Sequence, residues 1–270
     1  MDKEFDPNRY EDIESNATSG RHQEDDPEKD NPGVMTGIYS PDTKGTTSGE
    51  RVSISQESPI TREPAGLWAV VLAAGESRRM GTQKLLLPCP DRPMIRQVID
   101  NILSAGVEKI MVVTGSHRDE VVGALGGLPL HFSHNEKFRE GMLSSVICAI
   151  TALPEGTDAF LLFLGDQPFI PPEVTLEVIK AFRRNQKSIV IPVSGGKRGH
   201  PTLFDLKYLG EILTLPPEGG LRTLSVLHPE DILEVEVNSA EITRDIDTKN
   251  EYINALNKTE TPDRHSHPPV

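Results

Sequence analysis

The 270-residue sequence lacks the features on which several classes of protein depend. It has two cysteines, Cys89 and Cys148, too few for a secreted disulfide framework or a four-ligand zinc site, so we expect both to be reduced. No apolar run approaches the roughly 18 residues of a membrane span, and the acidic N-terminus has no apolar core of a signal peptide. These absences predict a cytoplasmic protein that does not enter a membrane.

Basic residues are scarce as well. The chain has 28 Lys and Arg against 41 Asp and Glu, which gives a formal net charge of −13 at pH 7. A surface that binds nucleic acid needs an excess of positive charge to neutralise phosphates. The composition therefore argues against a nucleic-acid partner.

The two ends of the chain have few apolar residues, and these follow no period. Residues 1–64 are acidic and rich in Pro, Ser, Thr and Gly, so they cannot bury enough apolar surface to offset the entropy of ordering. We predict a disordered acidic tail over 1–64, one folded domain over 65–257 and a second disordered tail over 258–270. The acidic tail is either a docking or regulatory arm or a solvated extension without a specific partner.

Between the tails, short apolar runs alternate with segments of helical periodicity. This alternation is typical of an α/β fold with a mostly parallel sheet and right-handed crossovers. In such open sheets ligands bind at the carboxyl ends of the strands. The predicted strands are 67–75, 109–115, 130–133, 159–166, 188–193 and 232–237, and the predicted helices are 92–104, 117–125, 141–153, 172–185, 206–215, 220–228 and 249–257.

The segment that follows the first strand combines glycines with cations. Residues 72–84 read LAAGESRRMGTQK. Glycines let backbone N–H groups approach an anion, and Arg78, Arg79 and Lys84 can neutralise phosphate oxygens. The segment matches neither a Walker A loop nor the GxGxxG dinucleotide pattern. We interpret it as a phosphate-binding loop; the alternative is an exposed basic turn.

The pattern LAAGxSxRMGxxK resembles the nucleotide-binding signature of the MobA-like NTP transferases and, within that family, is most similar to the molybdenum cofactor cytidylyltransferases. The resemblance extends from about Leu67 to Tyr252. It implies a Rossmann-like three-layer sandwich of the nucleotide-diphospho-sugar transferase type. It also implies a nucleotide site formed by Leu72, Ala73, Ala74, Gly75, Ser77, Arg79, Gly81, Lys84 and Ser144, with Lys84, Arg79 and Asp166 in catalytic roles.

Asp166 stands in FLGDQP, directly after an apolar strand. A carboxylate at the carboxyl end of a strand projects into the ligand crevice, where Mg²⁺ must lie to bridge triphosphate oxygens. The alternative is that Asp166 caps the next helix, but Pro168, Pro171 and Pro172 delay that helix. The motif also resembles the metal-binding aspartate of the family, so we predict that Asp166 binds Mg²⁺.

A second candidate lies in RDIDTKNEY, where Asp245 and Asp247 are two residues apart and face the same way on an extended chain. The segment resembles the DIDTPEDY ending of the family, and this likeness favours Asp247 as the second metal ligand. Alternatively, Asp247 or Thr248 caps the helix that starts near Lys249.

Two further segments point to the acceptor and to the nucleotide. Gly199, His200 and Pro201 lie in a segment that resembles the GHPVLF stretch near the pterin acceptor of the family. His200 either donates a hydrogen bond to the acceptor or is a structural histidine satisfied by backbone. Ser144 stands at the opening of a helix, where N–H groups bind an anion or a base edge unless they form an ordinary capped start.

These features predict a nucleotidyltransferase with Mg²⁺ as its cofactor. The resemblance implies transfer of CMP from CTP to the phosphate of molybdenum-bound molybdopterin, with release of pyrophosphate and with a molybdoenzyme as the recipient of the product. Ala74 is the residue at which guanylyltransferase relatives carry a second glycine. The alternatives are guanylyl transfer to the same pterin, nucleotidyl transfer to a sugar or polyol phosphate, and a non-catalytic chaperone that delivers cofactor to a molybdoenzyme.

Overall fold

The computed structural model describes residues 50–52, 66–77, 82–89 and 91–260. All of them belong to one compact unit, Thr46–Val270. Most of the two segments predicted as tails therefore lies outside the described residues. Residues 78–81 of the predicted phosphate loop lie outside them too.

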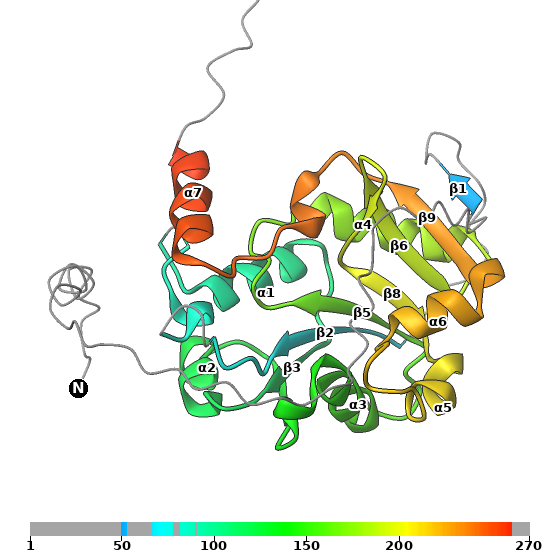
Figure 1. Ribbon diagram of the computed structural model, residues 1–270, viewed down its shortest axis with the longest axis horizontal. Coiled ribbons are helices and arrows are strands. Elements are labelled where there is room, and N and C mark those ends of the chain that lie inside the picture. Colours follow the sequence, from blue (N-terminus) through cyan, green and yellow to red (C-terminus); the bar gives the residue numbers. More distant parts are fainter. Residues whose placement is uncertain (1–49, 53–65, 78–81, 90, 261–270) are drawn as a thin grey trace, which may run out of the picture. The chain divides into compact units, whose positions relative to one another are not determined.

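Nine strands among the described residues form one sheet in the order β1-β9-β6-β8-β5-β2-β3-β4, with β7 paired to β6 (Figure 1). Strand β8 runs antiparallel to both of its neighbours, β7 is antiparallel to β6, and the other pairs are parallel. The strands are β1 (Glu50–Val52), β2 (Leu67–Ala73), β3 (Ile110–Thr114), β4 (His131–His134), β5 (Ala159–Leu164), β6 (Ile189–Ser194), β7 (Lys197–Arg198), β8 (Thr202–Asp205) and β9 (Ile232–Glu236).

Helices cover both faces of the sheet (Figure 1). One layer contains α1 (Met94–Ser104), α2 (Arg118–Ala124), α4 (Pro172–Arg184) and α7 (Lys249–Glu260), and the other contains α3 (Met142–Ala152), α5 (Leu209–Ile212) and α6 (Arg222–Leu227). Short 3-10 turns occur at η2 (Lys84–Leu86), η3 (Phe138–Glu140), η4 (Leu206–Tyr208), η5 (Pro229–Asp231) and η6 (Ala240–Thr243). None of the helices in the described ranges is long and apolar enough to cross a bilayer.

The central strands are apolar at nearly every position because both of their faces are buried. Along β2, Ala69 and Val71 belong to the core beneath α1 and α4, whereas Trp68 and Val70 belong to the core beneath α3. A strand between two helical layers has no solvent face, so its sequence does not alternate. The predicted fold class, an α/β three-layer sandwich with a mostly parallel sheet, is confirmed.

One predicted helix is wrong in extent. The sequence predicted a helix over 206–215, but the structure has the 3-10 turn η4 followed by the single turn α5, which ends at Ile212. The Asp205 carboxylate accepts a hydrogen bond from the Lys207 N–H at 2.8 Å and caps the 3-10 turn. Gly210 has low helix propensity and Pro216 cannot continue a helix, so a longer one is disfavoured.

The sheet also extends into the segment predicted as a disordered tail. Strand β1, at residues 50–52, pairs in parallel with β9 through Glu50↔Leu233 and Val52↔Val235. Helix α7 likewise runs to Glu260, three residues into the second predicted tail. The edge of β9 has backbone groups that an extended segment can pair with, and apolar periodicity does not report that contact.

Candidate functional site

The carboxyl ends of β2 and β5 meet at one rim of the sheet. The two strands are adjacent and parallel, with Leu72 paired to Leu164, and the Gly165 N–H donates to the Leu72 carbonyl at 3.0 Å. A Cβ at Gly165 would lie 2.9 Å from the Leu72 oxygen and 3.2 Å from Ile95 Cδ1. Only glycine fits this approach without displacement, and it keeps Asp166 beside the loop that follows β2.

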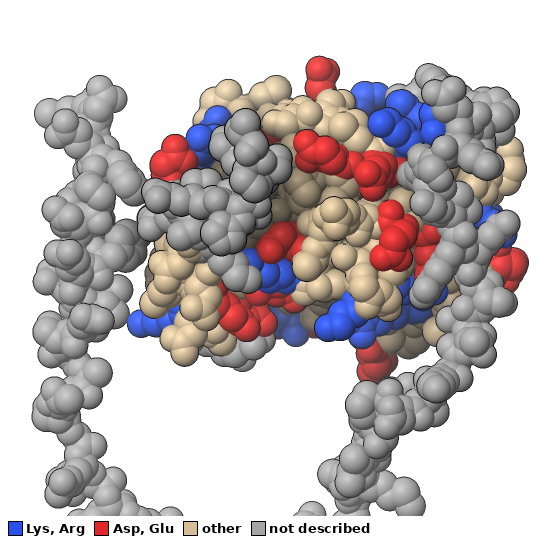
Figure 2. Space-filling model, turned by 90° about the horizontal axis from the view of Figure 1, so that it is seen from above, with Lys and Arg blue, Asp and Glu red and all other residues tan. Residues whose placement is uncertain are grey.

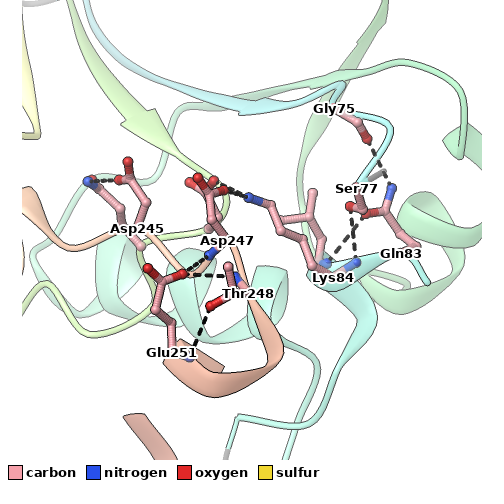
Figure 3. Close-up of polar contacts among 11 residues, drawn as sticks. Gly75, Ser77, Gln83, Lys84, Asp245, Asp247, Thr248 and Glu251 are labelled. Atoms are coloured by element: carbon pink, nitrogen blue, oxygen red, sulfur yellow. Dashed lines mark hydrogen bonds and ion pairs between the residues drawn. The ribbon is translucent and has the colours of Figure 1, made fainter. Parts of the chain in front are cut away.

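Lys84 joins three separate segments at this rim. Its Nζ lies 2.6 Å from Asp166 Oδ2 and 2.8 Å from Asp247 Oδ1 (Figure 3). The two aspartates are 82 and 163 residues from Lys84 along the chain. The structure thus brings together three residues that sequence analysis selected from three motifs.

The site contains more negative than positive charge among the groups described there. Burial lowers the pKa of Lys84, but the Asp166 and Asp247 carboxylates raise it above its ordinary value, so the side chain stays a cation. Partial desolvation and then the neighbouring Asp166 raise the pKa of Asp245, although a hydrogen bond from Gln167 Nε2 at 2.7 Å opposes this. Among the described groups of the site, three carboxylates, those of Asp166, Asp245 and Asp247, thus lie near one ammonium.

The backbone around residue 246 explains why both aspartates face the site. The Ile246 N–H donates to the Asp166 carbonyl at 3.1 Å, and the Ile246 side chain is fully buried in the core. On an extended chain the residues on either side of Ile246 face the opposite way, so Asp245 and Asp247 both turn toward the rim.

Gln167 was not selected by sequence analysis, although it directly follows Asp166 in FLGDQP. It is 4% exposed, and its Oε1 has no hydrogen-bond partner among the described residues.

Thr248, not Asp247, caps helix α7. The Thr248 Oγ1 accepts from the Glu251 N–H at 3.2 Å, and Glu251 Oε2 accepts from the Thr248 and Asp247 N–H groups at 2.8 and 2.9 Å (Figure 3). This reciprocal pair is a capping box. It leaves the Asp247 carboxylate directed at Lys84. Asp166 does not cap the next helix either, because α4 begins at Pro172 after Pro171.

A small hydrogen-bond network fixes the backbone of Lys84. Ser77 Oγ donates to Gln83 Oε1 at 2.5 Å and accepts from the Lys84 N–H at 3.1 Å. Gln83 is 6% exposed, and its Nε2 donates to the Gly75 carbonyl at 3.4 Å (Figure 3). The Ser77 hydroxyl therefore holds the loop. Gln83 was missed, and its place directly before Lys84 in the motif was the available signal.

The remaining residues of the predicted nucleotide site divide into two groups. Leu72 and Ala73 end β2, and the Ala73 and Ala74 side chains are buried at 2% and 6% exposure. Because these two side chains are buried, Ala73 and Ala74 would contact a ligand through their backbone groups. Arg78, Arg79 and Gly81 lie outside the described residues, so their roles stay predictions.

Ser144 is already engaged within its own segment. Its Oγ lies 2.9 Å from the Lys137 carbonyl and 2.8 Å from the Gly141 carbonyl, and it accepts from Asn135 Nδ2 at 2.9 Å. An exposed ion pair between Arg139 and Glu76, at 3.0 Å, connects this segment to the loop after β2. These contacts favour a structural role for the hydroxyl, and nucleotide binding by Ser144 stays a prediction.

The predicted acceptor loop lies at the same rim, since β8 starts beside the carboxyl end of β5. His200 Nδ1 is 3.2 Å from the Leu162 carbonyl. A carbonyl only accepts, so Nδ1 carries the proton and Nε2 of the neutral ring is an acceptor. Desolvation lowers the pKa of His200 and favours this neutral ring. A Cβ at Gly199 would lie 2.2 Å from the Ile242 oxygen, so this glycine serves close packing.

The two aspartates fit a hard divalent cation. Asp166 and Asp247 direct carboxylate oxygens at a single cationic atom, the Lys84 Nζ, and carboxylate oxygen is the donor that Mg²⁺ prefers. Among the described residues, no group of three or more His, Cys, Asp or Glu side chains is arranged to hold a metal. The pair would supply two ligands, and Mg²⁺ at phosphate-transfer sites commonly takes the rest from phosphates and water.

On the face seen in Figure 2, Lys and Arg side chains lie next to Asp and Glu side chains and do not form a patch of one sign.

The sequence model of one protein family, the MobA-like NTP transferase domain, matches residues 69–232, more than half of the chain. This protein belongs to that family. The MobA-like domain begins within β2 and ends at the start of β9, so it includes Lys84, Asp166 and the His200 loop, whereas Asp247 lies beyond it. The family is one of nucleotidyltransferases, and the predicted resemblance is confirmed.

Similar proteins cover the same span. A molybdenum cofactor cytidylyltransferase from Escherichia coli K12 is 29% identical over 188 residues, 69% of this chain and 93% of that protein. The crystal structure of Rv0371c from Mycobacterium tuberculosis H37Rv has a TM-score of 0.62 at 26% identity, and the alignment covers 71% of this chain and 98% of that one. A protein of Bacillus anthracis described as a glucose-1-phosphate thymidylyltransferase shares the fold, with a TM-score of 0.61, 16% identity and coverage of 74% and 98%.

Proposed function

We propose that this nucleotidyltransferase transfers CMP from CTP to the phosphate of molybdenum-bound molybdopterin and releases pyrophosphate, with Mg²⁺ as cofactor. The observation that carries the proposal is the convergence of the Lys84 ammonium with the Asp166 and Asp247 carboxylates at the rim where β2 and β5 end. A triphosphate needs both a cation from the protein and a metal-holding carboxylate, and this is where the chain provides them together.

In this proposal the acceptor phosphate attacks the α-phosphorus in line and pyrophosphate leaves. The backbone of residues 72–75 presents N–H and C=O groups to the base and ribose, and Lys84 neutralises charge on the triphosphate and the leaving pyrophosphate. Asp166 and Asp247 hold Mg²⁺, which supplies charge neutralisation of phosphate oxygens. An ionised phosphate needs no general base, so positioning and electrostatics provide most of the rate.

Three further assignments belong to the proposal. Arg79 and Gly81 complete the triphosphate contacts, and Ser144 contributes to the nucleotide site through the start of α3. Gly199, His200 and Pro201 border the acceptor. With Nδ1 donating to the Leu162 carbonyl, His200 offers Nε2 as a hydrogen-bond acceptor for an N–H or O–H group of the pterin.

The cytidine and pterin specificity is supported by the relative from Escherichia coli, whose length the chain almost fully spans. Ala74 supports it as well, because the guanylyltransferase relatives carry a second glycine at this position, directly after β2. A second candidate, nucleotidyl transfer to a sugar phosphate, is favoured by the fold shared with the protein described as a glucose-1-phosphate thymidylyltransferase. A shared fold does not fix the substrate.

The test is pyrophosphate release from ATP, CTP, GTP, UTP and TTP, each with molybdopterin, with glucose 1-phosphate or without acceptor. We expect release from CTP that depends on molybdopterin and on Mg²⁺, and none from an Asp166→Asn variant. Release from UTP or TTP that depends on glucose 1-phosphate would establish the second candidate instead. Tight CTP binding without release under any condition would identify a binding module.

A further inference from the structure

The Lys84 ammonium occupies the point on which two carboxylates converge. Its Nζ is 2.6 Å from Asp166 Oδ2 and 2.8 Å from Asp247 Oδ1, and the Lys84 side chain is only 13% exposed. These two oxygens are the ones that the proposed function assigns to Mg²⁺. An ammonium group and a metal ion cannot share that position, because they would occupy the same volume and repel each other.

The arrangement differs from that of an exposed ion pair elsewhere in the same chain. In the pair formed by Lys207 and Asp231, one ammonium at 2.6 Å meets one carboxylate, which also accepts from the Tyr208 hydroxyl. At Lys84 one ammonium meets two carboxylates, from segments 82 and 163 residues away along the chain. Two carboxylates carry the charge that matches one divalent cation, whereas a single ammonium matches only one of them.

The attachment of Lys84 lets its side chain move while its backbone stays. The Ser77 hydroxyl holds the Lys84 N–H, and Gln83 ties Ser77 to the Gly75 carbonyl, so the start of η2 is fixed. The four-carbon stem of lysine is flexible, and its ammonium binds phosphate oxygens as a point charge. The loop that precedes it is the one in which the proposed function places the triphosphate.

We propose that the Lys84 ammonium is an exchangeable internal counter-ion, which occupies the cation position between Asp166 and Asp247 until a bound triphosphate draws it away and a divalent cation replaces it. This inference rests on the proposed function. It makes metal binding conditional on nucleotide: the free enzyme binds a divalent cation weakly, and the enzyme with a triphosphate binds it well.

The experiment measures Mn²⁺ binding to the purified full chain by electron paramagnetic resonance of free Mn²⁺, without acceptor and without CTP. We expect weak binding by the wild type, no stronger than that of Asp166→Asn. Lys84→Met should bind Mn²⁺ about tenfold more tightly or better, within the range usual for coupled sites. Lys207→Met is the matched control, since it removes a lysine at the same distance from a single carboxylate, and it should behave like the wild type.

The melting temperature is a second readout, and it does not depend on a measured Mn²⁺ affinity. In Lys84→Met the Asp166 and Asp247 carboxylates lose the ammonium that they share, so the melting temperature should fall at neutral pH and recover when Mg²⁺ is added. The wild type without CTP should not respond to Mg²⁺. If the methionine variant does not fold, Lys84→Gln replaces it, and the wild-type comparison with Asp166→Asn needs no lysine variant.

The exchange is overturned if nucleotide-free wild type binds Mn²⁺ tenfold more tightly than Asp166→Asn, or if loss of Lys84 leaves Mn²⁺ affinity unchanged. Both outcomes are compatible with CTP-dependent pyrophosphate release, so the proposed function would survive them. Conversely, failure of that release with the Mn²⁺ results as expected would overturn the substrate assignment and leave the exchange intact.

Discussion

Two lysine–aspartate ion pairs have the same length, but one is largely buried and the other is exposed. Only the buried pair belongs to a candidate site. Lys84–Asp166 and Lys207–Asp231 both measure 2.6 Å. The Lys84 side chain is 13% exposed and meets residues 82 and 163 positions away, whereas Lys207 is 48% exposed and meets a residue 24 positions away. Distance alone therefore does not distinguish a functional pair from a surface pair.

Charge balance does distinguish them. Partial burial raises the pKa of Asp231, but hydrogen bonds from Lys207 and Tyr208 outweigh it and hold the pKa below its ordinary value. Near Lys84, desolvation and the Asp166 carboxylate raise the pKa of Asp245. Among the described residues, the Asp231 carboxylate has a lysine and a tyrosine hydroxyl as partners, whereas near Lys84 three carboxylates lie close to one ammonium.

The largest effect is expected from Asp166→Ala. Removal of a preorganised charge-stabilising group costs about 10²–10³ in turnover, so pyrophosphate release should fall at least a hundredfold. The fold should persist, as measured by far-ultraviolet circular dichroism. Asp231→Ala is the matched control and should keep its turnover per folded molecule; wild-type activity in Asp166→Ala would remove the metal assignment.

Lys84→Ala should lower turnover, whereas Lys207→Ala should lower only stability. Loss of Lys84 is expected to lower turnover about a hundredfold, because the charge on the triphosphate and the leaving pyrophosphate is no longer neutralised. Loss of Lys207 should leave turnover unchanged and lower the free energy of unfolding by at most about 1 kcal/mol, the usual range for exposed pairs. Steady-state assays and urea unfolding of both variants measure this. Normal turnover per folded molecule in Lys84→Ala contradicts it.

Thr248→Ala should lower the free energy of unfolding by about 1 kcal/mol, because α7 loses its N-cap. It should also raise the KM for CTP, since the cap holds the backbone from which Asp247 reaches Lys84. Thr248→Ser should restore both values. The control is Thr214→Ala, two residues after the end of α5, where the hydroxyl donates to the Glu211 carbonyl. An equal change of KM there would refute the link between cap and site.

The smallest effect is the pH dependence of the free energy of unfolding, which has opposite signs at Asp231 and at Asp245. The pKa of Asp231 is lowered, so its contribution to stability is present above the ordinary value of 3.8 and is lost as pH falls through the folded pKa. The pKa of Asp245 is raised, so its contribution is present below 3.8 and is lost as pH rises through the folded pKa.

At pH 7, measured by urea unfolding without metal, Asp245→Asn should therefore be slightly more stable than the wild type and Asp231→Asn slightly less stable. Each change should stay under about 1 kcal/mol, because both groups are partly solvated. Changes of the same sign in the two variants would contradict the difference in charge balance.

Most of the sheet was predictable because its signal is local. The runs that form β2, β3, β5 and β6 are apolar throughout, since helices cover both faces, and the predicted strands match them within two residues at each end. The insertion of β8 between β5 and β6 was not predictable in the same way. Its four residues carry no sign of which strands they will join or in which direction.

The candidate site was also predictable only in part. The amino-acid sequence by itself determined which residues have the right chemistry, because Lys84, Asp166 and Asp247 each stand in a short motif next to a strand or helix boundary. Only the tertiary structure decided that the three share one point, that the Asp247 carboxylate is directed at Lys84, and that Gln167 holds Asp245 beside them. The contacts of Lys84 with the two aspartates and of Gln167 with Asp245 join segments that are 78 to 163 residues apart, and a distance across space has no counterpart in local residue order.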